Sequence, residues 1–366
     1  FDYLRKQSES FKNFVDKYGE WIFMMIKSKA PLRIGLSGGG TDIENFSKNY
    51  GGFVINSAIN LYVHTIIDVK KNSKIVFESL DANKKIIFKS KNYLDLDGDF
   101  DIYKSIYNYL IKRFIKKPIS FHLKTYSDVP HGSGLGGSST MVVSIIKAFV
   151  EWFKLPLTKY DIAMLAYKIE RKDLNLVGGV QDQFSASYGG FNFIEIKKKT
   201  NLIKIKNLKI SSYMKSELLS RFLLLYTGIS RGSEKIIENQ IRYIDKDKKI
   251  GINSLLVMKK NTLLMKSYLK RDRKISQIIK ILRSNWMYKK KTGKGISNQR
   301  VNKIIERAYK FGAEAVKVSG AGGGGFILIA TPTENIFYLK KKLRSTRTFF
   351  YNFDFEEKGA QAWIIK

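Results

Sequence analysis

The chain contains no cysteine, and its 366 residues include only three histidines. Without cysteine there can be no disulfide bond, no thiol nucleophile and no cysteine-ligated zinc site. His64, His122 and His131 are scattered along the sequence, which argues against a histidine-bound metal. A metal ion would therefore need oxygen ligands, and Mg²⁺ is an ion that such ligands suit.

Long hydrophobic runs are also missing. No apolar stretch approaches the roughly 20 residues needed to cross a bilayer, and residues 21–26 are too short for the apolar core of a signal peptide. We therefore expect a cytoplasmic protein without a membrane partner. A length of 366 residues with 44% hydrophobic content allows one large or two ordinary domains, of which we expect two.

Acidic residues are scarce, because 32 Asp and Glu against 66 Lys and Arg give a formal net charge of +34. Such an excess is typical of proteins that bind nucleic acids or membranes. Here it is mostly lysine and is spread along the chain, with small clusters at residues 197–199, 289–291 and 340–342. We interpret it as solvated surface and predict no nucleic-acid partner, while a general attraction for anionic ligands remains.

Glycine, in contrast, gathers in three short runs, at residues 35–40, 132–137 and 320–325. The middle run follows a predicted strand at 121–126 and precedes a predicted helix at 138–153. Glycine lets backbone N–H groups turn inward, and a helix N-terminus favours an anion, so this run predicts a phosphate-binding loop. Three runs so far apart in the sequence predict one shared site.

The hydrophobic pattern predicts the elements around these runs. Strands are expected at 28–36, 52–68, 74–77, 85–89, 121–126, 222–226 and 326–330, and helices dominate residues 233–311. Ser138 or Ser139 is expected to cap the helix after the phosphate loop, and a second helix to begin near Thr158. We expect residues 1–23 to form an extension upstream of the fold.

Common nucleotide motifs do not account for the middle run. It satisfies the dinucleotide pattern G-x-G-x-x-G, but Glu151 and Asp161 lie in or beside helical patterns rather than at the end of a following strand. No Gly-Lys-Ser or Gly-Lys-Thr follows, and the protein-kinase elements His-Arg-Asp and Asp-Phe-Gly are absent. A nucleotide site whose cation is held by a hydroxyl and a carboxylate remains.

Three motifs in order, at residues 30–42, 130–140 and 317–325, resemble those of the GHMP family of small-molecule kinases. Within that family, Gly-Gly-Gly-Thr-Asp at 38–42 is similar to the D-glycero-D-manno-heptose 7-phosphate kinases and to the kinase part of fucokinases. The segments at 61–63, 178–183 and 353–363 are similar to the same subgroup.

The resemblance implies an α+β fold of two domains with the active site between them. Residues 25–205 would form the ATP-binding domain, which is like domain 2 of ribosomal protein S5 and has a left-handed βαβ crossover. Residues 206–366 would form a ferredoxin-like domain, and residues 1–24 an extension of uncertain structure.

The resemblance also implies roles for particular residues. Asp182 would accept or orient the proton of the sugar hydroxyl with Arg33 beside it, and Ser138 with Glu170 would hold Mg²⁺. The ATP phosphates would be bound by Gly132, Ser133, Gly134, Leu135, Gly136, Gly137, Ser138 and Ser139. The sugar would be bound by Gly39, Gly40, Thr41, Asp42, Gly179, Asp182, Gly322 and Gly323, and the phosphate of a sugar phosphate by Arg231 or Lys317.

Simpler explanations exist for several of these residues. Ser138 and Asp182 could cap helices, Glu170 could be a solvated residue at a helix end, and Arg231 could be an ordinary loop arginine. The third glycine run could be only a tight turn, and we interpret His131 as a loop residue facing ribose or solvent.

The function implied is an ATP- and Mg²⁺-dependent kinase that phosphorylates O1 of D-glycero-D-manno-heptose 7-phosphate to the 1,7-bisphosphate, in GDP-heptose and surface-polysaccharide synthesis. A free-sugar 1-kinase of the fucokinase or galactokinase type is the first alternative. A non-catalytic nucleotide- or nucleic-acid-binding protein on the same fold is the second. Either a monomer or a homodimer is compatible with the sequence.

Overall fold

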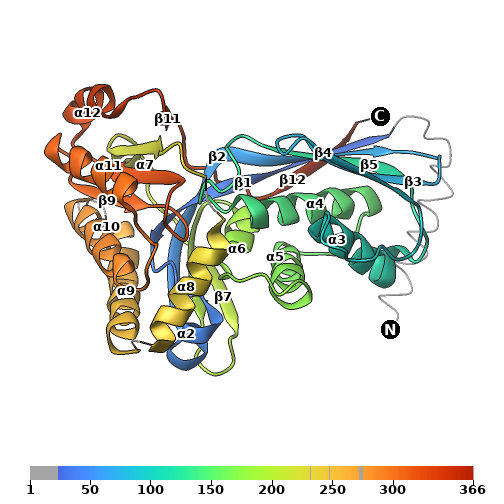
Figure 1. Cartoon of the computed structure of the whole chain (residues 1–366), viewed down its shortest axis with the longest axis horizontal. Helices are drawn as coiled ribbons and strands as arrows, with labels where there is room; N and C mark the ends of the chain where they lie inside the picture. Colours follow the sequence, from blue (N-terminus) through green and yellow to red (C-terminus); the bar gives the residue numbers. More distant parts are fainter. Residues whose placement is uncertain (1–23, 231, 247, 272–274, 366) are drawn as a thin grey trace.

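The computed structural model describes residues 24–365 apart from 231, 247 and 272–274. Of the expected extension over residues 1–24, only Met24 is among the described residues, and it is buried in the core. The described chain forms two lobes, each built on its own β-sheet (Figure 1).

The N-terminal lobe is built on a mixed eight-stranded sheet. Its main path runs β12-β1-β2-β5-β3-β4, and β6 and β7 continue from the other half of β2. The strands are β1 (Met25–Ser37), β2 (Gly52–Val69), β3 (Lys74–Ser79), β4 (Lys84–Lys89), β5 (Phe121–Ser127), β6 (Phe191–Ile196), β7 (Ile203–Asn207) and β12 (Gln361–Ile365). In β5 buried and part-exposed residues alternate, as in a half-buried strand.

One strand pair in this sheet, β3 with β5, is parallel. Parallel strands need a crossover connection, and the helix α3 (Asp101–Leu110) lies in that connection. The hand of the crossover stays a prediction. The π-helical turn η1 (Ile111–Ile115) extends α3.

The helices of the N-terminal lobe cover one face of the large sheet, on the lower side in Figure 1. They are α3, α4 (Gly137–Phe153), α5 (Lys159–Lys168) with its π-helical end η2 (Ile169–Asp173), and α6 (Gln181–Tyr188). On α4 the fully buried Val142, Ile145, Ile146 and Phe149 recur at helical spacing. The short helix α2 (Glu44–Tyr50) follows the first glycine run.

The C-terminal lobe contains an antiparallel four-stranded sheet in the order β11-β8-β10-β9. Its strands are β8 (Phe222–Tyr226), β9 (Ala315–Val318), β10 (Phe326–Ala330) and β11 (Phe349–Tyr351). Its helices are α7 (Ser212–Leu219), α8 (Ser233–Lys246), α9 (Lys248–Leu269), α10 (Ile275–Lys290), α11 (Gln299–Lys310), the 3-10 turn η3 (Thr333–Asn335) and α12 (Ile336–Leu343). Helices α8 to α11 separate β8 from β9, and α12 separates β10 from β11, which is the β-α-β-β-α-β order of a ferredoxin-like fold.

The two lobes share structure across the expected domain boundary. Strand β7 spans residue 205, and β12 returns to pair with β1. Leu32 of β1, Leu135 of the phosphate loop and Phe326 of β10 belong to one buried cluster. The division of the chain at residue 205 therefore does not coincide with the sheets, and the junction between the lobes is itself part of a core.

The structure tests two predictions about where helices begin and which residues cap them. The helix α5 begins directly after Thr158, which confirms the predicted start, and Thr158 caps it in a reciprocal capping box with Asp161. The prediction that Ser138 or Ser139 caps α4 is wrong, because the helix begins at Gly137 and its cap is Gly136, in a left-handed conformation without a side-chain cap bond. Neither serine hydroxyl caps this helix, and that of Ser139 donates to the Glu170 carboxylate instead.

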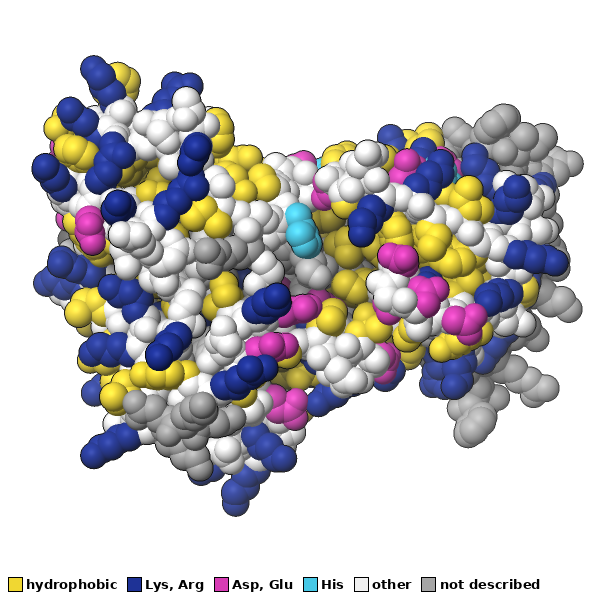
Figure 2. All heavy atoms as spheres, in the orientation of Figure 1, with side chains coloured by type: hydrophobic (Ala, Val, Ile, Leu, Met, Phe, Trp, Pro, Cys, Tyr) yellow, Lys and Arg dark blue, Asp and Glu magenta, His cyan; other side chains and the backbone are white. Residues whose placement is uncertain are grey.

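Basic side chains are spread over the face of the molecule seen in Figure 2 rather than gathered into one patch. None of the helices in the described part of the chain has the length and apolar character needed to cross a bilayer.

We predict that Thr158→Ala lowers the free energy of unfolding by about 1 kcal/mol. The Asp161 amide donates to the Thr158 hydroxyl at 3.2 Å, and the Thr158 amide donates to the Asp161 carboxylate at 2.9 Å, so the substitution leaves one helix donor without its partner. Urea unfolding of the full chain measures the change. Lys159→Ala, at the exposed next residue, is the matched control, and equal stability of the two variants would contradict the prediction.

Candidate active site

A cleft of about 410 Å³ opens between the two lobes, and all three glycine runs line it. The structure therefore brings together segments that lie far apart in the sequence. Of the predicted site residues, those lining the cleft are Arg33, Gly39, Gly40, Asp42, Gly132, Ser133, Gly134, Gly136, Gly137, Ser138, Ser139, Glu170, Gly179, Asp182 and Gly322.

The predicted phosphate loop links β5 to α4 and depends on glycine for its path. Gly132, Gly134 and Gly136 have φ angles of 70, 77 and 84°, which side-chain-bearing residues rarely adopt. Backbone N–H groups at such a loop, together with the N-terminus of a 17-residue helix, favour an anion.

The third glycine run supports this loop from the C-terminal lobe. The Phe326 amide donates to the carbonyl oxygen of Ser133 at 2.9 Å. A Cβ on Gly325 would lie 2.3 Å from the same oxygen, so the close approach of the two segments requires glycine. The run is therefore more than a tight turn, because its backbone packs against the phosphate loop.

A buried ion pair lies on the floor of the cleft. Arg33, on β1 and 3% exposed, donates from Nε to Oδ1 of Asp182 at 2.7 Å. Its Nη1 also donates to the carbonyl oxygen of Gly134 at 2.6 Å. Asp182 is the second residue of α6, so the helix cap is Val180 and not Asp182. The predicted catalytic pair is in direct contact and is tied to the phosphate loop.

Asp42 holds the start of the helix that carries Asp182. Its Oδ2 accepts from the amides of Val180 and Gln181 at 3.1 and 3.3 Å, and its Oδ1 accepts from the amide of Gly40 at 2.9 Å. Gly179 packs so closely that a Cβ would lie 1.9 Å from Oδ2. The carboxylate therefore compensates the N-terminus of α6 and positions Asp182.

Four predicted site residues do not line the cleft. Thr41 is fully buried, and its hydroxyl donates to the carbonyl oxygens of Gly38 and Phe53, so it stabilises the loop instead of reaching a sugar. The others are Leu135, whose side chain lies in the core, Gly323 and Lys317. Arg231, expected to bind a phosphate, lies outside the described residues.

Glu170 is not the solvated residue of the simpler explanation. It is 1% exposed, and its carboxylate accepts from the Ser139 hydroxyl at 2.9 Å and from Nε2 of Gln183 at 2.6 Å. Burial raises the pKa of Glu170, while the charge of Arg171 and the hydrogen bonds from Gln183 and Ser139 oppose this rise.

The donor set around Glu170 fits a hard cation that also binds phosphate. Within the described residues no three His, Asp or Glu side chains gather into a metal cage, and Mg²⁺ commonly takes one or two carboxylates with phosphate oxygens and water. The buried Oε1 of Gln183 has no hydrogen-bond partner among the described residues, which leaves an acceptor beside Glu170. Ser138 is exposed and lines the same cleft.

Lys289 is a cleft residue that the sequence reasoning missed, because it stands in a lysine cluster interpreted as solvated. It is 6% exposed, whereas Lys290 is exposed. The sequence does contain a sign of its burial, because Lys289 lies at helical spacing from Ile278, Leu282 and Asn285. All four residues are buried on α10.

Residues 101–190 match the family model of the GHMP kinases N-terminal domain, and residues 265–337 match that of the GHMP kinases C-terminal domain. The D-glycero-alpha-D-manno-heptose 7-phosphate kinase of Campylobacter jejuni is 42% identical over 340 residues, which are 93% of this chain and 99% of that protein.

Solved structures show the same likeness. A D-glycero-D-manno-heptose 1-phosphate kinase from Bacteroides thetaiotaomicron aligns with a TM-score of 0.79 and 35% identity, over 93% of this chain and 99% of that one. A Lactococcus lactis galactokinase complexed with galactose, 16% identical, aligns with a TM-score of 0.74 over 97% of this chain and 99% of that one and shares the fold.

We predict that stability rises with pH through Lys317. Burial, with the charges of Arg33 and Lys289, lowers the pKa of Lys317 to about 7, whereas an unfolded lysine has a pKa of about 10.4. Between these values the unfolded chain binds the extra proton, so the free energy of unfolding increases with pH. In Lys317→Met the increase from pH 7 to about pH 9.5 should be smaller by about 2–3 kcal/mol.

Urea unfolding at the two pH values measures this difference. Lys310→Met, at an exposed position, is the matched control and should keep the wild-type increase. An increase in Lys317→Met equal to that of the wild type would show that Lys317 is not the group responsible.

Proposed function

The chain belongs to the GHMP kinase family, and from this premise we propose that it transfers the terminal phosphoryl group of ATP to O1 of D-glycero-D-manno-heptose 7-phosphate. The predicted family and the two-domain α+β fold are confirmed, and the protein is a phosphotransferase of the sugar-kinase type. The residue roles that follow are part of the proposal.

The Arg33–Asp182 pair beside the phosphate loop is the observation that carries the proposal. Phosphoryl transfer needs an acceptor for the hydroxyl proton and positive charge near the transferred group. Asp182 Oδ1 is bound by Arg33, and Oδ2 has no hydrogen-bond donor among the described residues while Asp182 lines the cleft. We assign Oδ2 to the proton of the sugar hydroxyl.

Other residues of the cleft would bind the phosphates and the nucleobase of ATP. Backbone N–H groups of the phosphate loop would hold its phosphates. Val63, Ile102 and Met141 form an apolar part of the cleft with Asp81 and Ser127 beside it, which suits a nucleobase that has hydrogen-bonding edges.

Ser138 and Glu170 are the protein ligands that we propose for Mg²⁺. When bound, the ion would neutralise phosphate charge. Glu170 is held in place by Ser139 and Gln183, so a cation would meet a carboxylate that is already oriented.

The names of the two relatives differ in the sugar phosphate that they specify, one a heptose 7-phosphate and the other a heptose 1-phosphate. We propose the 7-phosphate as the acceptor, because the relative that carries this name is the more similar in sequence of the two. The use of the product in GDP-heptose synthesis, the cytoplasmic location and the monomeric or homodimeric state remain predictions.

We predict that Asp182→Asn lowers kcat at least about 100-fold with little change in the KM for ATP. Asparagine keeps an acceptor for Arg33 but cannot take up the proton. ADP release is measured with ATP, Mg²⁺ and a panel of heptose 7-phosphate, heptose 1-phosphate, mannose 6-phosphate, L-fucose and galactose. Asp173→Asn, at an exposed aspartate, is the matched control.

The panel separates the alternatives. Turnover of heptose 7-phosphate alone, lost in Asp182→Asn, supports the proposal. Turnover of L-fucose or galactose would favour a free-sugar kinase, and no turnover of any sugar would favour the non-catalytic reading. A kcat in Asp182→Asn within tenfold of the wild type would remove Asp182 from the proton-accepting role.

We predict that Glu170→Gln raises the Mg²⁺ concentration for half-maximal rate about 10-fold or more, because the neutral amide is a weaker ligand than a carboxylate. A magnesium titration of the initial rate at saturating ATP measures this. Glu314→Gln, at an exposed glutamate, is the control, and an unchanged magnesium dependence in Glu170→Gln would exclude Glu170 as a ligand.

A further inference from the structure

Lys289 is a buried cation without an anionic partner. Among the described residues no carboxylate lies within ion-pair distance of it, and its Nζ donates to two neutral oxygens, Gly39 O at 3.3 Å and Gln240 Oε1 at 3.2 Å. An ammonium group has three donors, so one remains after these bonds. A buried charge of this kind is costly unless a counter-charge reaches it.

The surroundings hold the ammonium group in place instead of neutralising it. Gln240 is fully buried, and its Nε2 donates to the Thr292 hydroxyl at 2.8 Å, which fixes Oε1 toward Lys289. Burial lowers the pKa of Lys289 to about 8, and the charge of Asp42 opposes this decrease. Oδ2 of Asp42 already accepts from the amides of Val180 and Gln181, and Oδ1 accepts from the amide of Gly40.

Lys289 and Asp182 both line the cleft. A Cβ on Gly40 would lie 3.0 Å from Nζ of Lys289 and 3.2 Å from Nε2 of Gln240, whereas a Cβ on Gly39 would lie 3.5 Å from Nε2 of Gln181. Gln181 directly precedes Asp182. The Gly39–Gly40 backbone therefore lies next to both the Gln181 side chain and the ammonium group of Lys289.

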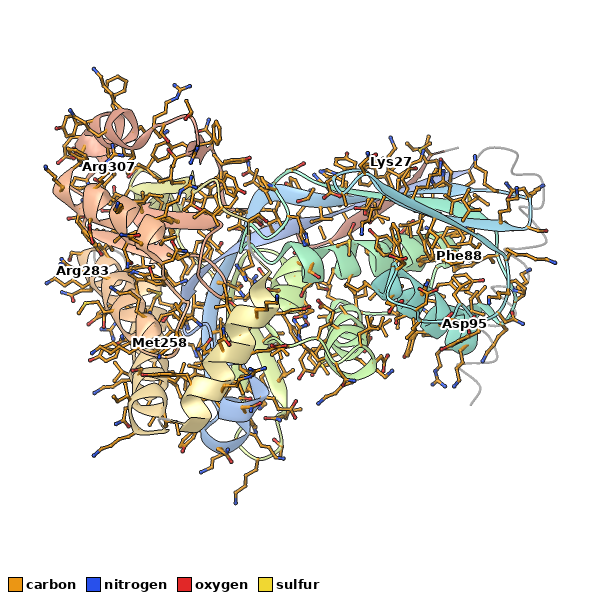
Figure 3. All side chains as sticks on the ribbon, in the orientation of Figure 1. Lys27, Phe88, Asp95, Met258, Arg283 and Arg307 are labelled. Atoms are coloured by element: carbon orange, nitrogen blue, oxygen red, sulfur yellow. The ribbon has the colours of Figure 1, made fainter. Side chains whose placement is uncertain are left out.

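The helix α10 turns only this lysine side chain toward the cleft. Figure 3 shows Arg283, on the same helix, at the outer edge of the C-terminal lobe. Arg283 and Lys290 are exposed, whereas Lys289 and Gln240 both line the cleft.

We propose that Lys289, positioned by Gln240, binds the phosphate group of the sugar phosphate acceptor while O1 faces Asp182. This inference rests on the proposed function and deepens it, since it assigns the group that selects a phosphorylated sugar over a free one. Lys317, predicted for this role, does not line the cleft and donates to the carbonyl oxygen of Gly35 at 2.7 Å. The guanidinium of Arg33 is already engaged by Asp182 and Gly134.

The test compares Lys289→Met with Lys290→Met, a matched change at the next, exposed residue. Steady-state kinetics of the full chain give kcat and KM for heptose 7-phosphate and for ATP. Lys289→Met should raise the KM for the sugar phosphate roughly 10- to 100-fold, the value of one hydrogen bond to a charged group, and leave the KM for ATP within about twofold. Lys290→Met should behave as the wild type.

Lys289→Arg is the second variant, since it keeps the charge and should recover most of the affinity. Calorimetric titration with heptose 7-phosphate measures binding independently of turnover, and thermal unfolding verifies that each variant folds.

The outcomes separate the inference from the proposed function. If the wild type phosphorylates heptose 7-phosphate and Lys289→Met keeps its KM, or changes only kcat, the inference fails and the function stands. If Lys289→Met weakens ATP and sugar phosphate equally, Lys289 shapes the cleft as a whole and the inference also fails. If the wild type neither binds nor phosphorylates any sugar phosphate, both fail.

Discussion

The guanidinium of Arg33 must be compensated, because it is buried in the middle of a strand at the junction of the lobes. Asp182 of α6 and the Gly134 carbonyl of the phosphate loop supply that compensation at 2.7 and 2.6 Å, and the Arg33 amide donates to the Leu135 carbonyl at 3.1 Å. One residue thus sets the positions of Asp182, the proposed proton acceptor, and of the predicted phosphate loop. Asp42 completes the arrangement by holding the first amides of α6.

Two buried lysines near this pair have no carboxylate within ion-pair distance among the described residues: Lys289, which lines the cleft, and Lys317, which does not. Burial lowers the pKa values of Lys317 and Lys289 to about 7 and about 8, and Arg33 and Lys289 act on Lys317 in the same direction. Buried cations that repel one another are costly in the free protein, and an anionic ligand offsets that cost. This small group of buried cations differs from the lysines on the face in Figure 2, which are dispersed.

Site residues that belong to a local sequence motif could be predicted from the sequence. Residues whose role depends on whether the fold buries or exposes their side chains could not. The glycine runs were predictable because their backbone conformation favours glycine, whereas Arg33, Glu170 and Asp182 were predicted from the resemblance of their motifs to those of the family. The role of Thr41 was not predictable, since its hydroxyl donates to the carbonyl oxygen of Phe53 in β2, a contact that only the folded chain creates. Lys289 looked like its solvated neighbours, although its spacing from Ile278 and Leu282 marked the buried face of α10.

The two lobes share a hydrophobic core, so the cleft lies between parts that are packed together and not between independent domains. Gly325 and Phe326 of the C-terminal lobe support the phosphate loop, and Lys289 donates to Gly39 of the N-terminal lobe. The C-terminal lobe thus contacts both the phosphate loop and the first glycine run of the N-terminal lobe. Leu32, Leu135 and Phe326 belong to the core cluster that the lobes share. A ligand that binds both ends meets groups already held in position, so its binding energy is available to align the acceptor hydroxyl with the phosphate to be transferred.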